Sequence, residues 1–178
     1  MATSDDIQNI FNSFISIFQN PLDRVNALIT VFGNLGYDEA TKAITTTQDD
    51  KSAVIFRCYC LSYIAYTVPN IDFTSSSDAL NLLDQINDIF EAQLKDDNIS
   101  GDTFSWLSRL KTKITTDIST RGSVLPQINQ FTCEMLPLPV ISQYLYQTGA
   151  RSDEILIRNN NTVVHPLFYS GTLEVLSS

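Results

Sequence analysis

The first third of the chain repeats apolar residues at helical spacing. Within residues 7–18 and again within residues 22–32, apolar side chains recur three or four positions apart, which is the period of one face of a helix. Asn20-Pro21 separates the two runs, and a capping residue followed by proline is favoured at the start of a helix. The pattern predicts two amphipathic helices joined by a short break.

A longer apolar run occupies residues 51–67. It is apolar on nearly every side and too long for a strand, and Pro69 follows it. Such a run predicts a central buried helix with other helices packed around it. Arg57 and Ser62 interrupt the stretch, and its uninterrupted parts are shorter than the roughly 20 apolar residues that cross a bilayer. We therefore expect no membrane-spanning segment here.

Two further helices are predicted before residue 122. Ser75 with Asp78 three residues later forms a capping-box pattern, and an apolar stripe runs through residues 79–94. Asp102 precedes a second stripe, which ends at Arg121-Gly122, a basic last turn followed by a glycine stop. That stripe consists of Trp106, Leu107, Leu110, Ile114 and Ile118. Five helices over residues 4–121 would form a helical domain of residues 1–122.

The pattern changes at residue 123, where prolines and β-compatible residues become frequent. The predicted elements are a strand at residues 128–133, a helix from Pro139 to Thr148 ended by Gly149, a helix from Ser152 to Asn159, and a strand after Gly171. Residues 123–178 would then form a small α+β module with the order strand, helix, helix, strand. The expected fold class is mainly α, with the helical domain followed by this module.

Charge and composition narrow the function. The 178 residues include 11 Lys+Arg and 20 Asp+Glu, a net charge of −9, and charged residues make up only 17%, below the roughly 25% of typical soluble domains. With so few charges, the surface must consist largely of Ser, Thr, Asn and Gln, or else of apolar patches that partners cover. The densest basic group is Arg109, Lys111 and Lys113, which is too small to neutralise phosphates, so we expect no nucleic-acid partner.

The cysteines and the start of the chain indicate a reducing compartment. Residues 1–6 lack the positive and apolar regions of a secretory signal. The chain has three cysteines, an odd number, and Cys58 and Cys60 lie on different faces of the predicted helix. We expect no disulfide. Cys133 alone is too few to complete a zinc site with them, so no metal or other cofactor is expected.

Residues suited to catalysis are scarce. His165 is the single histidine, and its neighbour Pro166 favours a turn rather than a general base. Three acid pairs lie at predicted helix edges, where capping and solubility explain them, namely Asp49-Asp50, Asp96-Asp97 and Asp153-Glu154. Glycine-rich phosphate loops, G-x-S-x-G and H-E-x-x-H do not occur. We therefore expect that the protein is not an enzyme.

The C-terminal module carries a more specific signal. The stretch 144–155 (YLYQTGARSDEI), followed by Arg158-Asn159, His165-Pro166, Gly171 and residues 173–176 (LEVL), resembles a LysM-type module. The resemblance implies that Ile155 is buried in the second helix, that Asn159 closes it and that Gly171 turns into the last strand. Asn tolerates the left-handed conformation of a helix end, and Gly permits the tight turn.

Together with residues 120–122 (TRG) and 125–126 (LP), the same stretch is similar to the C-terminal part of the DNA circularisation proteins of Mu-like phages. These are tail proteins, which in contractile-tailed phages lie beside the tape measure and central hub components. The segments Asn20-Pro21 and 73–75 (FTS) sit where that family has a helical region.

Two departures from the family limit which of its properties can be expected of this protein. Its additional N-terminal domain has no counterpart in this sequence. The Gly-Asp-Thr that opens the first helix of a LysM module, and helps to hold the N-acetylglucosamine chain, is replaced by residues 136–139 (LPLP). The family name implies DNA contact, which a charge of −9 does not favour.

The resemblance implies a structural virion protein of a contractile phage tail, made in the host cytoplasm. It would act as an adaptor in the baseplate or tail tip, in multiple copies. Its partners would be other tail proteins (hub, tube, tape measure and wedge neighbours), with neither nucleic acid nor membrane among them. The candidate partner-binding residues are Tyr144, Tyr146, Arg151, Asn159, His165, Phe168 and Tyr169.

Two alternatives from other classes remain open. The first is a peptidoglycan-binding LysM-type module that attaches a particle or a hydrolase to the cell wall, with a sugar groove between the first loop and the loop after Asn159. The second is a peptidoglycan-cleaving enzyme, in which Glu134 or Glu154 would have to supply the acid.

Overall fold

The computed structural model describes residues 4–45, 51–160, 162–163, 165 and 167–177. The chain divides into two compact units. Unit 1 comprises residues 1–73 and 79–122, and unit 2 comprises residues 74–78 and 123–178. The prediction of a mainly helical chain is confirmed.

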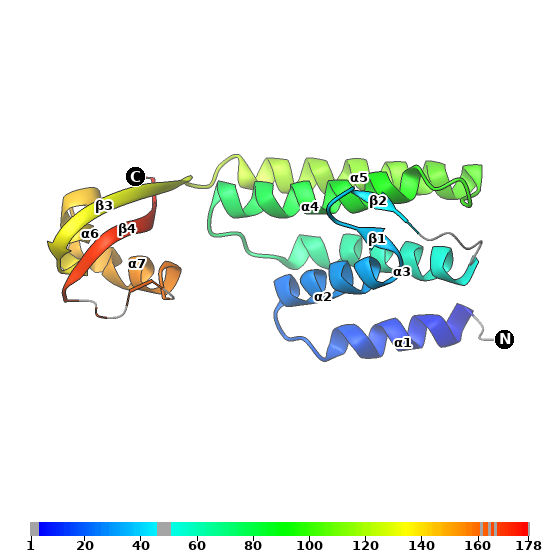
Figure 1. Cartoon of the computed structure of the whole chain (residues 1–178), viewed down its shortest axis with the longest axis horizontal. Coiled ribbons are helices and arrows are strands. Elements are labelled where there is room, and N and C mark those ends of the chain that lie inside the picture. Colours follow the sequence, from blue (N-terminus) through cyan, green and yellow to red (C-terminus); the bar gives the residue numbers. More distant parts are fainter. Residues whose placement is uncertain (1–3, 46–50, 161, 164, 166, 178) are drawn as a thin grey trace. The chain divides into compact units, whose positions relative to one another are not determined.

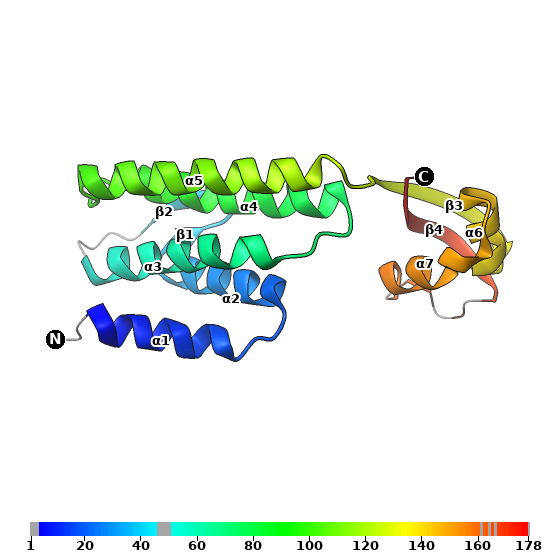
Figure 2. The same cartoon turned by 180° about the vertical axis from the view of Figure 1, so that it is seen from behind.

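Unit 1 is built from helices whose axes run in a common direction in Figures 1 and 2. They are α1 (Ser4–Ser16), α2 (Pro21–Asn34), α3 (Lys51–Thr67), α4 (Ser76–Leu94, in unit 1 from Ala79 onward) and α5 (Gly101–Gly122). Two of the predicted caps form. The Asn20 side chain accepts a hydrogen bond from the Leu22 N–H at 2.9 Å. Ser75 Oγ accepts one from the Asp78 N–H at 3.0 Å and donates to Asp78 Oδ2 at 2.6 Å.

The predicted helix after residue 100 forms α5. It begins at Gly101 with Asp102 in its first turn, and Ser100 Oγ caps it by accepting the Thr103 N–H at 3.1 Å. Trp106 was expected on the core face, and this was wrong. Leu107 is fully buried, whereas Trp106 is 45% exposed, because adjacent positions point about 100° apart around a helix.

The sequence patterns did not predict a small β-hairpin in unit 1. Strands β1 (Tyr37–Asp38) and β2 (Ala43–Ile44) pair antiparallel, and a 3₁₀ turn, η1 (Val68–Asn70), follows α3. The Asp38 carboxylate accepts hydrogen bonds from the Ala40 N–H at 3.0 Å and the Thr41 hydroxyl at 2.9 Å. These bonds shape the hairpin turn locally, in a segment too short to show a two-residue alternation.

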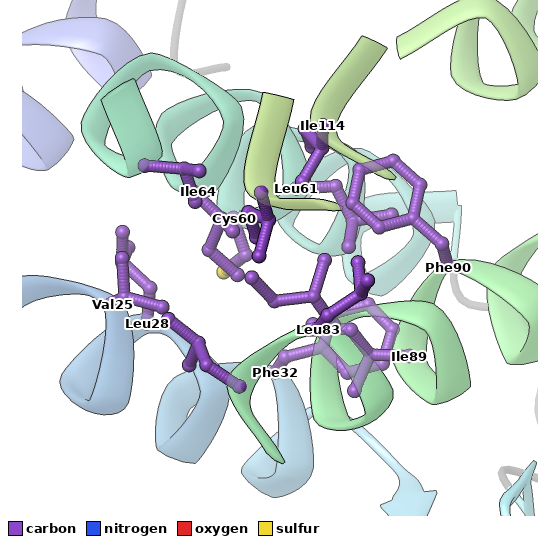
Figure 3. Packing of buried hydrophobic residues seen from close by; sticks show 14 of the residues in the cluster. Val25, Leu28, Phe32, Cys60, Leu61, Ile64, Leu83, Ile89, Phe90 and Ile114 are labelled. Carbon is purple, nitrogen blue, oxygen red and sulfur yellow. The ribbon is translucent and has the colours of Figure 1, made fainter. Parts of the chain in front are cut away.

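The core of unit 1 forms around α3, which contacts α1, α2 and α5. Figure 3 shows side chains of α2, α3, α4 and α5 meeting there. The labelled residues are Val25, Leu28 and Phe32 of α2, Cys60, Leu61 and Ile64 of α3, Leu83, Ile89 and Phe90 of α4, and Ile114 of α5. The helix was predicted to be buried on all sides, and here the prediction was wrong. Ile55 is 45% and Tyr66 71% exposed, because none of the described parts of unit 1 covers that side.

Unit 2 follows the predicted order of strand, helix, helix and strand. It contains β3 (Ile128–Leu136), α6 (Leu138–Tyr146), the 3₁₀ turn η2 (Gly149–Arg151), α7 (Ser152–Arg158) and β4 (Tyr169–Leu176). β3 and β4 pair antiparallel, with a register shift between Cys133 and Leu136. The helices and the sheet share a separate core that includes Leu138, Ile141, Ile155 and Leu173. Ile155 is 1% exposed, as the LysM-like pattern implied.

Three local expectations in unit 2 were wrong. α6 ends at Tyr146 with Gln147 in the left-handed conformation (φ 57°), whereas Gly149 starts η2. The helix stops early because Thr148 already caps the next turn, accepting the Ala150 N–H at 3.3 Å. Asn159 closes α7 with φ −109° rather than in the left-handed conformation. Gly171, with φ 139°, lies inside β4 rather than before it.

Candidate partner-binding surface of unit 2

The outward side of α6 carries exposed apolar side chains. Leu138 and Ile141 face the core with exposures of 1% and 0%, whereas Val140 is 48% and Tyr144 74% exposed. Val140 and Tyr144 are four residues apart and so share one face of the helix. The ring of Phe131 on β3 lies 5.8 Å from that of Tyr144, centroid to centroid. We call Phe131, Val140 and Tyr144 the α6 outer surface.

Tyr146 and Arg151 belong to a half-buried cluster at the junction of α6 and α7. The Arg151 guanidinium lies 3.8 Å from the centroid of the Tyr146 ring. Its Nε and Nη2 donate to the two carboxylate oxygens of Glu154, each at 2.9 Å. Burial raises the pKa of Tyr146, and the nearby Arg151 cation opposes this rise. The cluster holds the end of α6 against the start of α7.

Asn159 and Tyr169 are buried, at 6% and 7% exposure. Asn159 Nδ2 donates to the carbonyl oxygens of Ile155 and Glu174, both at 2.8 Å, and its Oδ1 accepts the Glu174 N–H at 2.9 Å. The Tyr169 hydroxyl donates to the Thr172 carbonyl at 3.0 Å. Asn159 thus joins α7 to β4, the Tyr169 hydroxyl is bonded within β4, and both side chains are buried away from a partner.

His165 and Phe168 lie together in the loop before β4. Their rings stack with centroids 6.0 Å apart, and His165 Nδ1 accepts the Leu167 N–H at 3.2 Å. Phe168 is 68% and Leu167 52% exposed. Of the seven candidate residues, Tyr144, His165 and Phe168 are therefore the ones whose side chains are available to a partner in this form.

The acidic candidates have structural partners or lie in solvent. Both oxygens of Glu154 are bound to Arg151, and Glu134 is exposed on β3. Asp96 accepts hydrogen bonds from Arg57 in unit 1, and the Asp49-Asp50 pair lies outside the described residues. Within the part of the chain that the structure describes, no group of three or more His, Cys, Asp or Glu side chains could hold a metal ion.

A polar hollow of about 340 Å³ opens on unit 2. Its lining includes Gln130, Arg158, Thr172 and Glu174, and it contains no aromatic residue. Residues 136–139, which stand where a LysM module holds its sugar, are not part of this lining. The lining does include Asn159 and Thr162, which belong to one side of the expected sugar groove. The hollow therefore coincides with only part of the groove expected for the peptidoglycan-binding alternative.

Sequence reasoning missed several exposed apolar side chains of unit 2. They are Val124, Met135, Val140, Ile157 and Leu167. Met135 takes a positive φ of 40° at the irregular part of β3, which a sequence pattern does not reveal. Val140 could have been found from the period of the predicted helix, because it lies four residues before the candidate Tyr144.

Comparison with known families and with curated proteins identifies no relative. No protein-family model matches the chain, and no curated protein matches its sequence. Among the described residues, the helices are all too short or too polar to cross a membrane. The resemblance to DNA circularisation proteins therefore depends on the residues quoted for it, and function must be argued from the surfaces.

Proposed function

We propose that the protein is a structural adaptor in the baseplate or tail tip of a contractile phage tail, linking the central hub or tube to surrounding proteins. The observation that carries this proposal is the α6 outer surface. Val140 and Tyr144 expose 48% and 74% of their area on one helix face, beside Phe131. Aromatic side chains of this kind anchor protein–protein interfaces.

Other exposed side chains of unit 2 support a protein partner. Met135, Ile157 and Phe168 are 72%, 74% and 68% exposed. Large apolar groups left in water are a cost that a partner removes on binding. The low fraction of charged residues, 17%, fits a surface that is mostly covered in an assembly.

The charges of unit 2 favour a protein over a nucleic acid. Its sequence contains two basic residues besides His165, namely Arg151 and Arg158. Arg151 is paired with Glu154, and Arg158 lies 3.4 Å from Asp78 and donates to the Thr74 hydroxyl at 2.9 Å. Phosphate binding needs cations that are free to replace counterions, and both of these are engaged.

The peptidoglycan alternative has weaker support. Its polar hollow lacks an aromatic platform on which a sugar ring could stack. It predicts saturable binding of the purified protein to peptidoglycan in a pull-down, whereas the adaptor proposal predicts none. The enzyme alternative predicts lytic activity that disappears in Glu134→Gln or Glu154→Gln.

Incorporation into particles tests the adaptor proposal. Val140→Ser and Tyr144→Ser should each lower the amount of this protein in purified particles, measured by quantitative mass spectrometry. The amount of free protein should stay unchanged, because both side chains point away from the core. Gln143→Ser, an exposed neighbour on α6, is the matched control. Normal incorporation of both variants would contradict the proposal.

A further inference from the structure

One side of α3 in unit 1 is left in solvent. The apolar residues of α3 do not gather on one face, and a helix that is apolar all round is normally covered all round. α1, α2 and α5 contact α3, yet Ile55 and Tyr66 remain 45% and 71% exposed. Because α3 is apolar on all sides, we expect a further structural element to cover its exposed side.

Two cavities lie along this side of α3. One, of about 500 Å³, is bounded by α3 and the first turns of α5, including Trp106. The other, of about 520 Å³, is bounded by α3 and α1, including Asn12 and Ile15. Tyr59 and Ser62 line both cavities, so the two join into one groove across α3.

The floor of this groove has the spacing of a helix face. Ile55, Tyr59, Ser62 and Tyr66 lie at positions i, i+4, i+7 and i+11 of α3, a span of about 16 Å. We call the groove above these four residues the α3 groove. Its length matches about three turns of a second helix packed against α3.

Two hydroxyl groups along the α3 groove have partners within the chain. The Tyr63 hydroxyl donates to Asn12 Oδ1 at 2.7 Å, and Ser62 Oγ donates to the Cys58 carbonyl at 2.6 Å. The groove therefore offers mainly apolar surface. An extended peptide would leave its backbone groups unpaired there, since a helix-lined groove has no strand edge, whereas a helix satisfies its own backbone.

The charges on the α5 side of the groove are mainly positive. Lys51 lines it, and Arg109 and Lys113 follow Trp106 at three and seven residues, on the same side of α5. Among the described residues, none of these three cations has an ion-pair partner. The acidic residues on this side of α5 are Asp102, four residues before Trp106, and Asp117, eleven residues after it and paired with Arg121. The local balance is thus opposite in sign to the net charge of −9.

We propose that the α3 groove binds an amphipathic helix of a partner protein. The apolar stripe of that helix lies against Ile55, Tyr59 and Tyr66, and acidic side chains line the edge that faces α5. A groove bounded by α1 and α5 suits a helix, which is about 10 Å wide, better than it suits a flat membrane surface. The proposal is independent of unit 2 and gives the molecule a second docking surface.

Two labelled helical peptides test this proposal with the full chain. Both carry the same leucine stripe, flanked by glutamate in one and by lysine in the other, and fluorescence anisotropy measures their affinities. The glutamate peptide should bind about tenfold more tightly or better, since charge complementarity selects the partner. Lys113→Glu, which removes one cation and adds one anion, should largely abolish that preference.

Substitution at the groove separates specific from non-specific binding. Tyr66→Ser should weaken binding of the glutamate peptide by about tenfold, and this side chain is too exposed for its loss to unfold the helix. Ile17→Ser, just after α1 and equally exposed at 72%, should leave binding unchanged.

Four outcomes would overturn the proposal. They are absence of binding, equal affinity for the two peptides, equal effects of the two serine variants, and tighter association with anionic vesicles than with the glutamate peptide. A concentration-dependent dimer that Tyr66→Ser abolishes would also overturn it, by showing that a second copy of the chain occupies the groove.

Discussion

Asp96→Asn removes the negative charge that faces a buried arginine in unit 1. The side chains of Arg57 and Asp96 are 2% and 6% exposed, with Nη2 and Oδ2 2.7 Å apart. The other guanidinium nitrogens donate to Gln93 Oε1 and to the Leu35 carbonyl, each at 2.7 Å. The arginine therefore ties α3 to α4 and to the end of α2, and its charge depends on Asp96 for compensation.

Loss of one partner from a buried ion pair costs about 3–5 kcal/mol, because the remaining charge stays buried without compensation. An amide at position 96 keeps an acceptor, so we expect the lower end, about 3 kcal/mol. That loss corresponds to a fall of about 1–3 M in the urea midpoint for a domain of this size. Trp106 is the single tryptophan and lies in unit 1, so its fluorescence reports the unfolding of this unit.

Asp97→Asn is the matched control, because Asp97 is the exposed neighbour. Equal urea midpoints for the two variants would refute the reasoning. Combining Asp96→Asn with Arg57→Met should recover at least half of the loss, since no buried charge then remains.

The same pair predicts a pH dependence. Burial by itself would raise the pKa of Asp96, but hydrogen bonds from the Asn98 N–H and from the side chains of Arg57, Asn98 and Gln93 outweigh it, so the pKa is lowered. The stabilising effect of the Asp96 carboxylate is therefore complete above the unfolded-state pKa of about 3.9, and this effect is lost as the pH falls below that value. The stability gap between wild type and Asp96→Asn should narrow on acidification below about pH 4.

Three further predictions concern single residues. Asn159→Ala leaves the Glu174 N–H of β4 without its acceptor and removes two further hydrogen bonds of the buried Asn159 side chain, and should lower the opening free energy of unit 2 in hydrogen exchange by about 2 kcal/mol; unchanged protection of β4 would count against it. Gly171→Ala should destabilise unit 2 by more than about 1 kcal/mol because φ is 139°, whereas Gly33→Ala, with open space around it, should stabilise α2 by about 0.5–1 kcal/mol. Shifts of the melting temperature in the same direction for both glycine variants would contradict this pair of predictions. Burial raises the pKa of Cys60 to about 12, so a thiol reagent at pH 8 should label it only in urea; rapid labelling of the native protein would show that this part of the core opens.

The helices could be predicted because their signals are local. Asn20 and Ser75 cap helices through bonds to residues two and three positions away, and the apolar period of residues 79–94 fixes the buried face of α4. The alternation of residues 172–176 likewise predicted the final strand. Signals of this kind need no knowledge of distant parts of the chain.

The expectations that were wrong concern features that depend on tertiary neighbours. Whether α3 is covered on every side depends on how many helices pack against it, and the sequence of α3 does not contain that number. Asn159 and Tyr169 were candidates for partner binding because of their residue types. Their burial follows from bonds to Glu174 and Thr172, and those contacts exist only once the unit has folded.

The arrangement of the candidate surface was only partly predictable. Tyr144 was singled out for its chemistry, but its neighbour Phe131 comes from β3 and its neighbour Val140 from the previous helical turn. Pairing across elements places the three together, and a list of aromatic residues cannot indicate this.

The location of the protein in a particle tests the central claim most directly. Contractile particles purified from a host that carries the gene should contain this protein by mass spectrometry. An antibody against it should label the distal end of the tail in negative-stain images. Absence of the protein from particles that are otherwise complete would contradict the adaptor account.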